Sequence, residues 1–586
     1  MPAGMADRKR QRKEGQRRGL SSKAKGFPKP GSWQHLVGLA LVFGVLGIGM
    51  SIRHAEDWNT DAIAYLRLAH YWVEGPWRLA VSGYWGPLFC WIFAGVLGLG
   101  GSPFLAVRVG MLIGAGIFVW GGWSMVREFL EEEQERLWAS VLIGGLAVVA
   151  IGGEVTPDLL VAGCLLLACV RWFRPDWSCR GKIQLWSGVL WGVAYLAKAV
   201  ALPAGVLWLA TAVMFHRIWT KASWGRLSRA LCRTVLAAGV IMVPWVTVLS
   251  LKYHRLTFST AAEAAHAIVG PNWPAPVHPF GLTLHSVEPG RVTAWEDPTS
   301  LPYPRWSPFT SVEAFRHQCW VCLRNIKYEF HILNGFDLLG FGIFVLIGTV
   351  GVGAIRRDLW QQWKTGWMVW LVLGWCLLFL PGYLSPREER YFYAGHPLLV
   401  ILAFWGMERV GQWLPLSYKR LSFWLRWVVV GSFGGILILR GIGAWEKDGR
   451  WPVYAARIVA QAIEREGDGG AVAGSGFLQS ERVGLYAAYF LGIPWVGDQE
   501  GLPEDRLEAL GVRWVVLRFS RPENKRFQKD PRYEEVKGLS WGIRGAPEFP
   551  IRVYHRIGGK GEGKKQAAGD AVFHSARLRE GARIVR

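Results

Sequence analysis

The sequence predicts an all-α polytopic membrane domain of about eleven transmembrane helices, followed by a small C-terminal extracytoplasmic α/β domain. Two observations predict this fold class. The 586 residues are 51% hydrophobic with a mean hydropathy of +0.19, which is too apolar for an ordinary soluble protein. The basic residues behind the net charge of +23 gather in an N-terminal arm and in short links between apolar runs. Because this charge pattern is typical of membrane topology, we expect membrane lipids and no nucleic acid as partners.

The N-terminal arm, residues 1–34, is predicted to be disordered and cytosolic. It is rich in Lys and Arg, with Gly, Ser and Pro between them. The apolar run at 35–52 follows without an obvious small-residue cleavage site, so we expect a retained signal anchor. The N-terminus is then cytosolic, and residue 53 lies outside the cytosol.

Twelve apolar runs come close to the length of about 20 residues that a membrane span needs. They lie near 35–52, 85–101, 104–126, 137–153, 157–173, 184–199, 200–217, 232–251, 336–355, 366–383, 392–411 and 422–441. If all twelve crossed the bilayer, Arg127, Arg136 and the basic link at 171–182 would lie outside, against the positive-inside rule. If the short, Gly-rich run at 85–101 lies in the outer interface instead, every basic link falls in the cytosol. Eleven spans result.

These spans form a predicted transmembrane domain over 35–445, with external loops at 53–103 and 252–335. The second loop holds six of the thirteen His, and its length indicates a functional role or a lid. Residues 446–560 alternate helix-like and strand-like segments, among them "VYAARIVAQAIE", "GAVAGS", "RWVVLRF" and "IRVYHRI", which predicts the extracytoplasmic α/β domain. Residues 561–586 are a basic tail.

Acidic residues gather on the predicted outer face. Asp57 and Asp61 are four residues apart, as are Asp61 and Tyr65, so on a helix they share one face. Such carboxylates can bind a cation or take a proton from a hydroxyl, but they can also cap a helix. Glu154 and Asp158, between two apolar runs, present the same pair of alternatives.

Basic residues on the same face are Lys198, Arg387 and Arg390. Lys198 interrupts the otherwise almost uncharged run 185–215, and we favour anion binding over snorkelling to the surface. Arg387 and Arg390 lie in "SPREERYFYAGHP", where salt bridges to the two adjacent glutamates are the alternative. The guanidinium fork matches phosphate well, so a phosphate at the outer membrane boundary would explain all three cations.

A metal site has weaker support. Cys319 and Cys322 in "CWVC" form a single pair without a second Cys or His set at zinc spacing. A disulfide, or two thiols on one helix face, is the favoured interpretation of this pair. A divalent metal ion stays an open alternative as a cofactor, since histidines of the 252–335 loop could supply ligands.

Six motifs, in order and spacing, resemble the C-type glycosyltransferase superfamily (GT-C). They are "TDAIAYLRLAHYWVEG", "YWGPLFCWIFA", Arg108 at the start of a span, "EVTPDLL", "GVLWGVAYLAKAVALP" and "RYFYAGHPLLVILAF". The resemblance covers about residues 35–445, and it is greatest to the protein O-mannosyltransferases and the bacterial lipid A aminoarabinose transferases. It implies an enzyme of a bacterial inner (plasma) membrane that transfers a sugar from a polyprenyl-phosphate (or dolichyl-phosphate) carrier to an extracytoplasmic hydroxyl, with inversion. The acceptor would be a protein, a lipid or a glycan.

The resemblance also implies roles for single residues. Asp61 matches the catalytic acid of the first loop, and Glu154 with Asp158 matches a second acidic site. Lys198 and the pair Arg390 and Tyr391 match groups that bind the donor phosphate.

Two departures from the family pattern leave the assignment open. Ala62 stands where a second acid often follows Asp61, which leaves Asp57 as a rival for the base. Trp85 replaces the lysine of the aminoarabinose branch, and we expect Trp85 and Tyr65 to contact substrate. The alternatives are a transporter or flippase of lipid-linked sugars, or a degenerate, non-catalytic GT-C-like scaffold.

Overall fold

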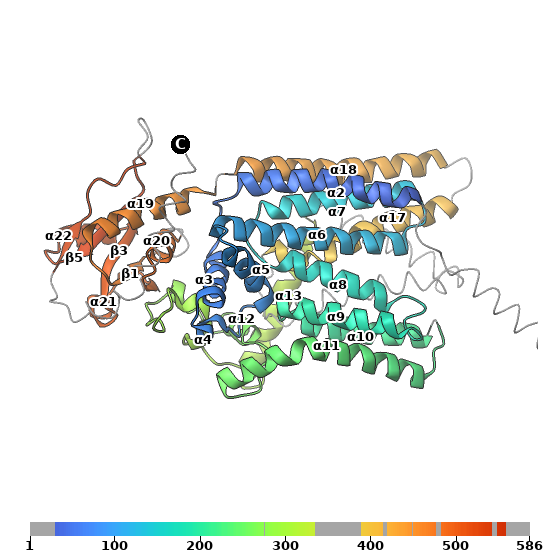
Figure 1. Cartoon of the computed structure of the whole chain (residues 1–586), viewed down its shortest axis with the longest axis horizontal. Helices are drawn as coiled ribbons and strands as arrows, with labels where there is room; N and C mark the ends of the chain where they lie inside the picture. The colour runs from blue at the N-terminus through green and yellow to red at the C-terminus, as the bar shows by residue number, and fades with distance from the viewer. Residues whose placement is uncertain are drawn as a thin grey trace, which may run out of the picture.

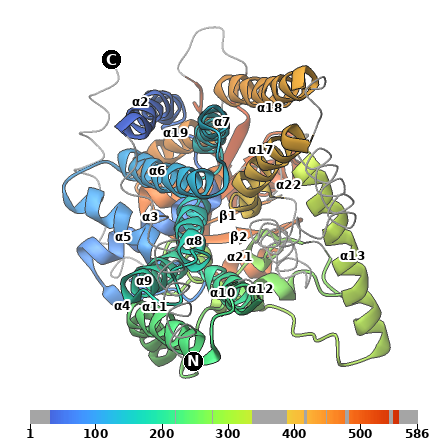
Figure 2. The same cartoon turned by 90° about the vertical axis from the view of Figure 1, so that its right-hand side faces the viewer.

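The computed structural model describes residues 30–218, 220–274, 276–334, 388–413, 419–447, 449–475, 482–541 and 548–557. Long helices run roughly side by side to form a bundle, and a sheet with its own helices lies at one end of it (Figure 1). The short helices α3, α4 and α5 lie between the bundle and the sheet. Figure 2 shows the bundle along its helices, with α8 near the middle. The site described below lies where these parts meet.

The bundle contains nine long helices among the described residues. These are α2 (Pro30–Arg53), α6 (Pro103–Phe129), α7 (Glu133–Ile151), α8 (Asp158–Trp172), α9 (Gly181–Ala197), α10 (Ala201–Ile218), α11 (Trp224–Tyr253), α17 (Gly395–Trp413) and α18 (Lys419–Glu446). By length and composition, five stretches are long and apolar enough to cross a membrane, namely α6, α7, α10, α11 and Trp427–Glu466. The predicted spans at 336–355 and 366–383 lie outside the described residues.

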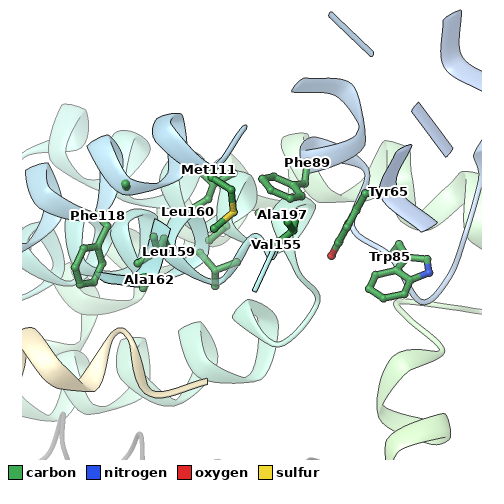
Figure 3. Packing of buried hydrophobic residues seen from close by; sticks show 14 of the residues in the cluster. Tyr65, Trp85, Phe89, Met111, Phe118, Val155, Leu159, Leu160, Ala162 and Ala197 are labelled. Atoms are coloured by element: carbon green, nitrogen blue, oxygen red, sulfur yellow. The ribbon is translucent and has the colours of Figure 1, made fainter. Parts of the chain in front are cut away.

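Small residues let α6 and α8 pack closely in the middle of the bundle. A Cβ atom on Gly121 would lie 2.7 Å from the carbonyl oxygen of Gly163, so the two backbones almost touch at this crossing. Around it, side chains such as Phe118, Leu159 and Leu160 fill one continuous apolar core (Figure 3). The close crossing fixes α8, and with it the acidic residue at its start.

The segment predicted as the first external loop, residues 53–103, contains the short helices at the sheet end. They are α3 (Thr60–Glu74), α4 (Trp77–Ala80) and α5 (Pro87–Gly98). With 12 residues, α5 is about 18 Å long, which is too short to cross a bilayer. This length agrees with the interfacial position predicted for the 85–101 run.

The second external loop is packed against α3 and the sheet. It contains α12 (Ala261–Ala267), three single 3₁₀ turns, η1 (Pro279–Gly281), η2 (Ala294–Glu296) and η3 (Pro298–Ser300), and α13 (Val312–Asn334). A fourth 3₁₀ turn, η4 (Glu389–Phe392), precedes α17. On α13, Cys319 and Cys322 are free thiols.

The C-terminal part forms a five-stranded mixed sheet in the order β2-β1-β3-β5-β4. Its elements are α19 (Trp451–Glu466), β1 (Ala471–Gly474), α20 (Val483–Leu491), β2 (Trp495–Asp498), α21 (Glu504–Ala509), β3 (Val512–Arg518), α22 (Glu523–Lys529), β4 (Tyr533–Glu535) and β5 (Ile551–Arg556). Strand β1 is parallel to β2 and β3, with Ala473 opposite Val515, whereas β5 is antiparallel to β3 and β4. Strands β1, β3 and β5 fall where the sequence predicts them. Strands β2 and β4, of four and three residues, were not predicted.

The sheet is joined to the external loops by backbone hydrogen bonds. Trp495 N donates to Val292 O at 2.7 Å, and His285 N donates to Val496 O at 2.8 Å, so the loop covers the outer edge of β2. On α20, the Tyr486 hydroxyl donates to the backbone oxygen of Trp58 at 2.9 Å. The C-terminal part therefore packs directly on the turn that precedes α3.

Candidate active site

The start of α3 is tied to the link between α7 and α8. Asn59 caps the helix, since its Oδ1 accepts from Ala62 N at 3.1 Å, and its Nδ2 donates to Val155 O at 3.3 Å. Asn59, and not Asp61, is therefore the capping residue. The Asp61 carboxylate, in the first turn of α3, is directed to other partners.

Arg390 in η4 joins three carboxylates from three separate segments. Its Nη1 lies 2.9 Å from Asp61 Oδ2 and 3.2 Å from Glu154 Oε2. Its Nη2 lies 2.5 Å from Glu388 Oε2. The side chains of Asp61 and Arg390 are only 13% exposed, whereas that of Glu154 is 51% exposed. We call Arg390, Asp61, Glu154 and Glu388 the arginine cluster.

Within the arginine cluster, the pKa values of Arg390 and Glu154 are both raised. Burial alone would lower the pKa of Arg390, but Tyr391 and Asp61 raise it well above its ordinary value, so the guanidinium stays charged. The surrounding protein raises the pKa of Glu154 by desolvation, and Arg390 opposes this rise. A further cation, Arg482, comes from the turn before α20. Burial lowers its pKa, but neighbours that include Tyr486 and Glu154 raise it overall.

Lys198 and Asp158 form a second ion pair. Lys198 Nζ lies 2.8 Å from Asp158 Oδ1 and 2.9 Å from Oδ2, and Thr156 Oγ1 donates to the same carboxylate. The ammonium group also lies 4.7 Å from the ring centre of Tyr391, which follows Arg390 directly in the chain. We call Lys198, Asp158, Thr156 and Tyr391 the lysine cluster. The two clusters are thus adjacent through η4.

The broken helix that carries Lys198 is held by the "WGPL" segment. Lys198 has an extended backbone and ends α9, and α10 begins three residues later. A Cβ atom on Gly86 would lie 2.2 Å from the backbone oxygen of Ala197, so only glycine fits against this helix end. The segment therefore fixes the position from which Lys198 reaches the site.

Tyr65 and Trp85 lie next to each other (Figure 3). Their ring centres are 4.8 Å apart, and the Phe89 ring centre is 5.0 Å from that of Tyr65. Tyr65 is 2% exposed and Trp85 7% exposed, so both belong to the apolar core. Their contact with a substrate stays a prediction.

Asp57 contacts His54 and Arg108. Its Oδ2 lies 3.3 Å from His54 Nδ1, and its backbone oxygen accepts a hydrogen bond from Arg108 Nη2 at 2.7 Å. The structure therefore brings together Asp61, Glu154 and Arg390 but not Asp57. Arg387, the other predicted phosphate ligand, lies outside the described residues.

Trp295 of the loop at 252–335 reaches the site, although its role was not predicted from the sequence. Trp295 Nε1 donates to Asp61 Oδ1 at 3.3 Å. Next to it, His278 Nδ1 lies 2.8 Å from the Tyr303 hydroxyl, and burial lowers the pKa of His278 to about 4, so the imidazole is neutral at physiological pH. The unusual length of the loop was the available signal, but nothing in the sequence pairs position 295 with position 61.

The described ranges contain no group of three or more His, Cys, Asp and Glu side chains placed to hold a metal ion. The histidines of the second loop instead contact aromatic rings and hydroxyl groups, as His278 does with Trp295 and Tyr303.

Two comparisons relate this chain to known proteins. Residues 85–246 match the family model for dolichyl-phosphate-mannose-protein mannosyltransferases. The apo structure of ArnT from Cupriavidus metallidurans matches with a TM-score of 0.54 at 15% identity, over 89% of this chain and 98% of that chain. The resemblance to the GT-C superfamily is confirmed. The ArnT structure bound to undecaprenyl phosphate matches with a TM-score of 0.51 at 14% identity, over 88% and 98% of the two chains. No curated protein sequence matches this chain significantly. At these identities, the structural likeness to the GT-C enzymes is one of fold.

Proposed function

We propose that this chain is a membrane glycosyltransferase that moves a sugar from a polyprenyl-phosphate (or dolichyl-phosphate) carrier to a hydroxyl group on the extracytoplasmic face. The observation that carries the proposal is the arginine cluster, in which a buried carboxylate from the first external loop meets a cation beside the lysine cluster. The match to ArnT, which was solved with undecaprenyl phosphate bound, supports a lipid phosphate as the carrier. The acceptor would be a protein, a lipid or a glycan.

Asp61 is the proposed general base. Its carboxylate would accept the proton of the acceptor hydroxyl while the hydroxyl oxygen forms a bond to the anomeric carbon of the sugar. The bond between that carbon and the carrier phosphate oxygen breaks in the same step, and its electron pair leaves with the phosphate. Attack from the face opposite the leaving group gives inversion.

Lys198 and Arg390 are the proposed cations for the departing phosphate. An ammonium group has three donors, of which two are used by Asp158, so one stays available to a phosphate oxygen. The Arg390 guanidinium offers a planar fork that can rearrange from carboxylate to phosphate. Tyr391, whose ring lies beside Lys198, would line the same phosphate position.

We place the site end of the bundle on the extracytoplasmic side of a bacterial inner membrane. Glu154 of the site lies in the link between α7 and α8, and α7 has 19 residues, which is about 28 Å of helix. The preceding link, with Arg127 and Arg136 beside it, is therefore one bilayer thickness away, where the positive-inside rule puts the cytosol. The same orientation would put the basic arm, residues 1–34, in the cytosol and the domain at 446–560 outside.

The rival functions differ in where they need polar groups. A transporter or flippase of lipid-linked sugars usually has ionisable groups near the middle of the membrane, whereas both clusters here lie in links at one end of the bundle. A degenerate scaffold would tolerate the loss of Asp61. The enzyme proposal is therefore tested at this residue.

The test compares Asp61→Asn with Asp57→Asn, a matched pair of carboxylates from the same loop. We expect Asp61→Asn to lower sugar transfer by about 10²-fold or more, since that is a typical contribution of a general base. Asp57→Asn is expected to change it less than about 10-fold. Mass spectrometry of lipid extracts would show polyprenyl-phosphate sugars accumulating with the Asp61 variant, and membrane fractionation would check insertion. Unchanged lipids with a normally inserted Asp61→Asn variant would refute the proposal.

A further inference from the structure

Both oxygens of the Asp61 carboxylate are held, and by different kinds of donor. Oδ2 lies 2.9 Å from the Arg390 guanidinium, whereas Oδ1 accepts from the indole N–H of Trp295 at 3.3 Å. Trp295 belongs to the second external loop and is 4% exposed. The two donors come from segments that lie 95 positions apart in the sequence.

The turn that carries Trp295 is fastened to α3, the helix that carries Asp61. Glu296, the next residue, is fully buried, and its Oε2 accepts from the Tyr71 hydroxyl on α3 at 2.8 Å. Its other oxygen accepts from the backbone N–H of Val292 at 2.8 Å, within the same turn. Glu296 thus fixes η2 to α3, the helix that carries Asp61.

Two further contacts hold η2 from its other sides. The Trp85 indole donates to the backbone oxygen of Trp295 at 2.8 Å. Asp297, the residue after Glu296, accepts at its Oδ1 from the Tyr253 hydroxyl at 2.9 Å. A turn anchored at three successive residues has little freedom to move the indole of Trp295 away from Asp61.

We propose that Trp295 is a positioning residue for Asp61, which it holds in the rotamer needed to receive the acceptor proton. The proposal rests on the function proposed above. The terminal torsion of an aspartate is broad, and Arg390 alone does not fix it, because two other carboxylates compete for the same guanidinium. The indole N–H fixes the second oxygen without adding a charge, so the carboxylate keeps its negative charge for the acceptor.

The test replaces Trp295 by Phe, which removes the N–H donor and keeps an aromatic ring. The matched control is Trp514→Phe, because Trp514 is also buried and its indole donates at 3.2 Å to a backbone oxygen, that of Asp468, in the C-terminal sheet and outside both clusters. The donor is the polyprenyl-phosphate sugar fraction extracted from cells that lack the protein, and the envelope fraction of the same cells supplies the hydroxyl acceptor. Release of polyprenyl phosphate by the detergent-solubilised full chain is followed by mass spectrometry.

For Trp295→Phe we expect kcat to fall about 10-fold, with KM and the binding of undecaprenyl phosphate within about twofold of wild type. Trp514→Phe should keep wild-type kcat. The effect of Trp295→Phe should also largely disappear in an Asp61→Glu background, because the longer side chain no longer presents its oxygen to the indole. A defect in packing would instead be as large in that background as alone.

The outcomes separate the two proposals. If the wild-type chain releases no polyprenyl phosphate, the proposed function fails. If wild type is active and Trp295→Phe keeps its kcat, or loses kcat and undecaprenyl phosphate binding together, the positioning role is overturned. If Trp295→Phe does not insert, Tyr253→Phe replaces it, because this change removes the hydroxyl that anchors the turn at Asp297 and leaves Asp61, Trp85 and Trp295 unchanged. A kcat about 3-fold lower supports the positioning role, and an unchanged kcat overturns it.

Discussion

The arginine cluster and the lysine cluster are neighbours, but their charges are balanced differently. The Arg390 guanidinium pairs with three carboxylates, whereas the Lys198 ammonium pairs with one carboxylate, that of Asp158. Even with Arg482 nearby, the first cluster carries an excess of negative charge. The second is neutral.

This difference assigns opposite tasks to the two clusters. An excess of carboxylate favours a site that accepts a proton, so the base belongs with Arg390. A balanced pair can release its cation when a stronger anion arrives, so the phosphate belongs with Lys198. Arg390 and Tyr391 are adjacent on η4 and belong to the two different clusters, so this turn links the two tasks.

The largest effect is expected from Arg390→Lys, which keeps the charge but removes the fork. A single ammonium cannot reach Asp61, Glu154 and Glu388 together, so we expect sugar transfer to fall by about 10²-fold to 10³-fold. The matched control is Arg440→Lys. Arg440 Nη1 donates to Glu389 Oε1 at 3.0 Å, on the same 3₁₀ turn but outside the arginine cluster.

Equal losses of transfer in Arg390→Lys and Arg440→Lys would contradict the task assigned to the arginine cluster. The guanidinium fork of Arg390 would then only hold η4 in place. The measurement is release of polyprenyl phosphate from extracted lipid donor, with the amount of inserted protein as the reference.

A smaller effect is expected from Lys198→Met, which removes the ammonium and keeps an unbranched chain of similar length. Because the lost cation would bind the phosphate, we expect undecaprenyl phosphate to bind about 10-fold more weakly, and transfer to fall by a similar factor. The variant also leaves Asp158 unpaired, so Lys198→Met should be compared with Lys198→Met/Asp158→Asn. Restored binding in the double variant would contradict a direct phosphate contact, because only the unpaired acid would then have been harmful.

Much of this site could be predicted from the sequence, because its residues interrupt apolar runs. Lys198 and Glu154 are conspicuous where a membrane protein is otherwise uncharged, and the positive-inside rule places them on one side. The short α5 was predicted in the same way. Strands β1, β3 and β5 were predicted because they are short apolar runs next to Gly-rich turns.

The remainder depends on contacts between distant segments, which local patterns do not contain. The bond from Trp295 to Asp61 joins positions 234 residues apart, and nothing in "TAWEDP" reveals its partner. The choice between Asp57 and Asp61 is of the same kind. Both precede or begin the same helix, and only the path of η4 brings Arg390 to one of them.

Asp498→Asn should leave sugar transfer unchanged, which is the smallest effect expected here. Asp498 is a buried carboxylate outside both clusters, so it shows the effect of burial separately from the effect of ion pairing. Asp498 ends β2, is 3% exposed, and lines a small cavity with Gly474, Arg482 and Trp495. Burial raises its pKa from the ordinary 3.8 to about 7, although Arg521 lowers it. Between these two pH values only the folded protein keeps the proton, so the free energy of unfolding should fall as pH rises, by up to about 1.4 kcal/mol per pH unit.

Asp498→Asn stays neutral at every pH and should remove this slope, so the variant should gain stability over wild type as pH rises from about 4 to about 7, and by a constant amount above that. Thermal unfolding of the full chain in detergent at several pH values measures the slope, with Asp505→Asn on the exposed face of α21 as the control. Parallel curves for Asp498→Asn and wild type would mean that Arg521 already neutralises the buried carboxylate. The burial of Asp498 would then have no pH-dependent cost in stability. The contrast between well-paired and poorly paired acids in this protein would rest on the arginine and lysine clusters alone.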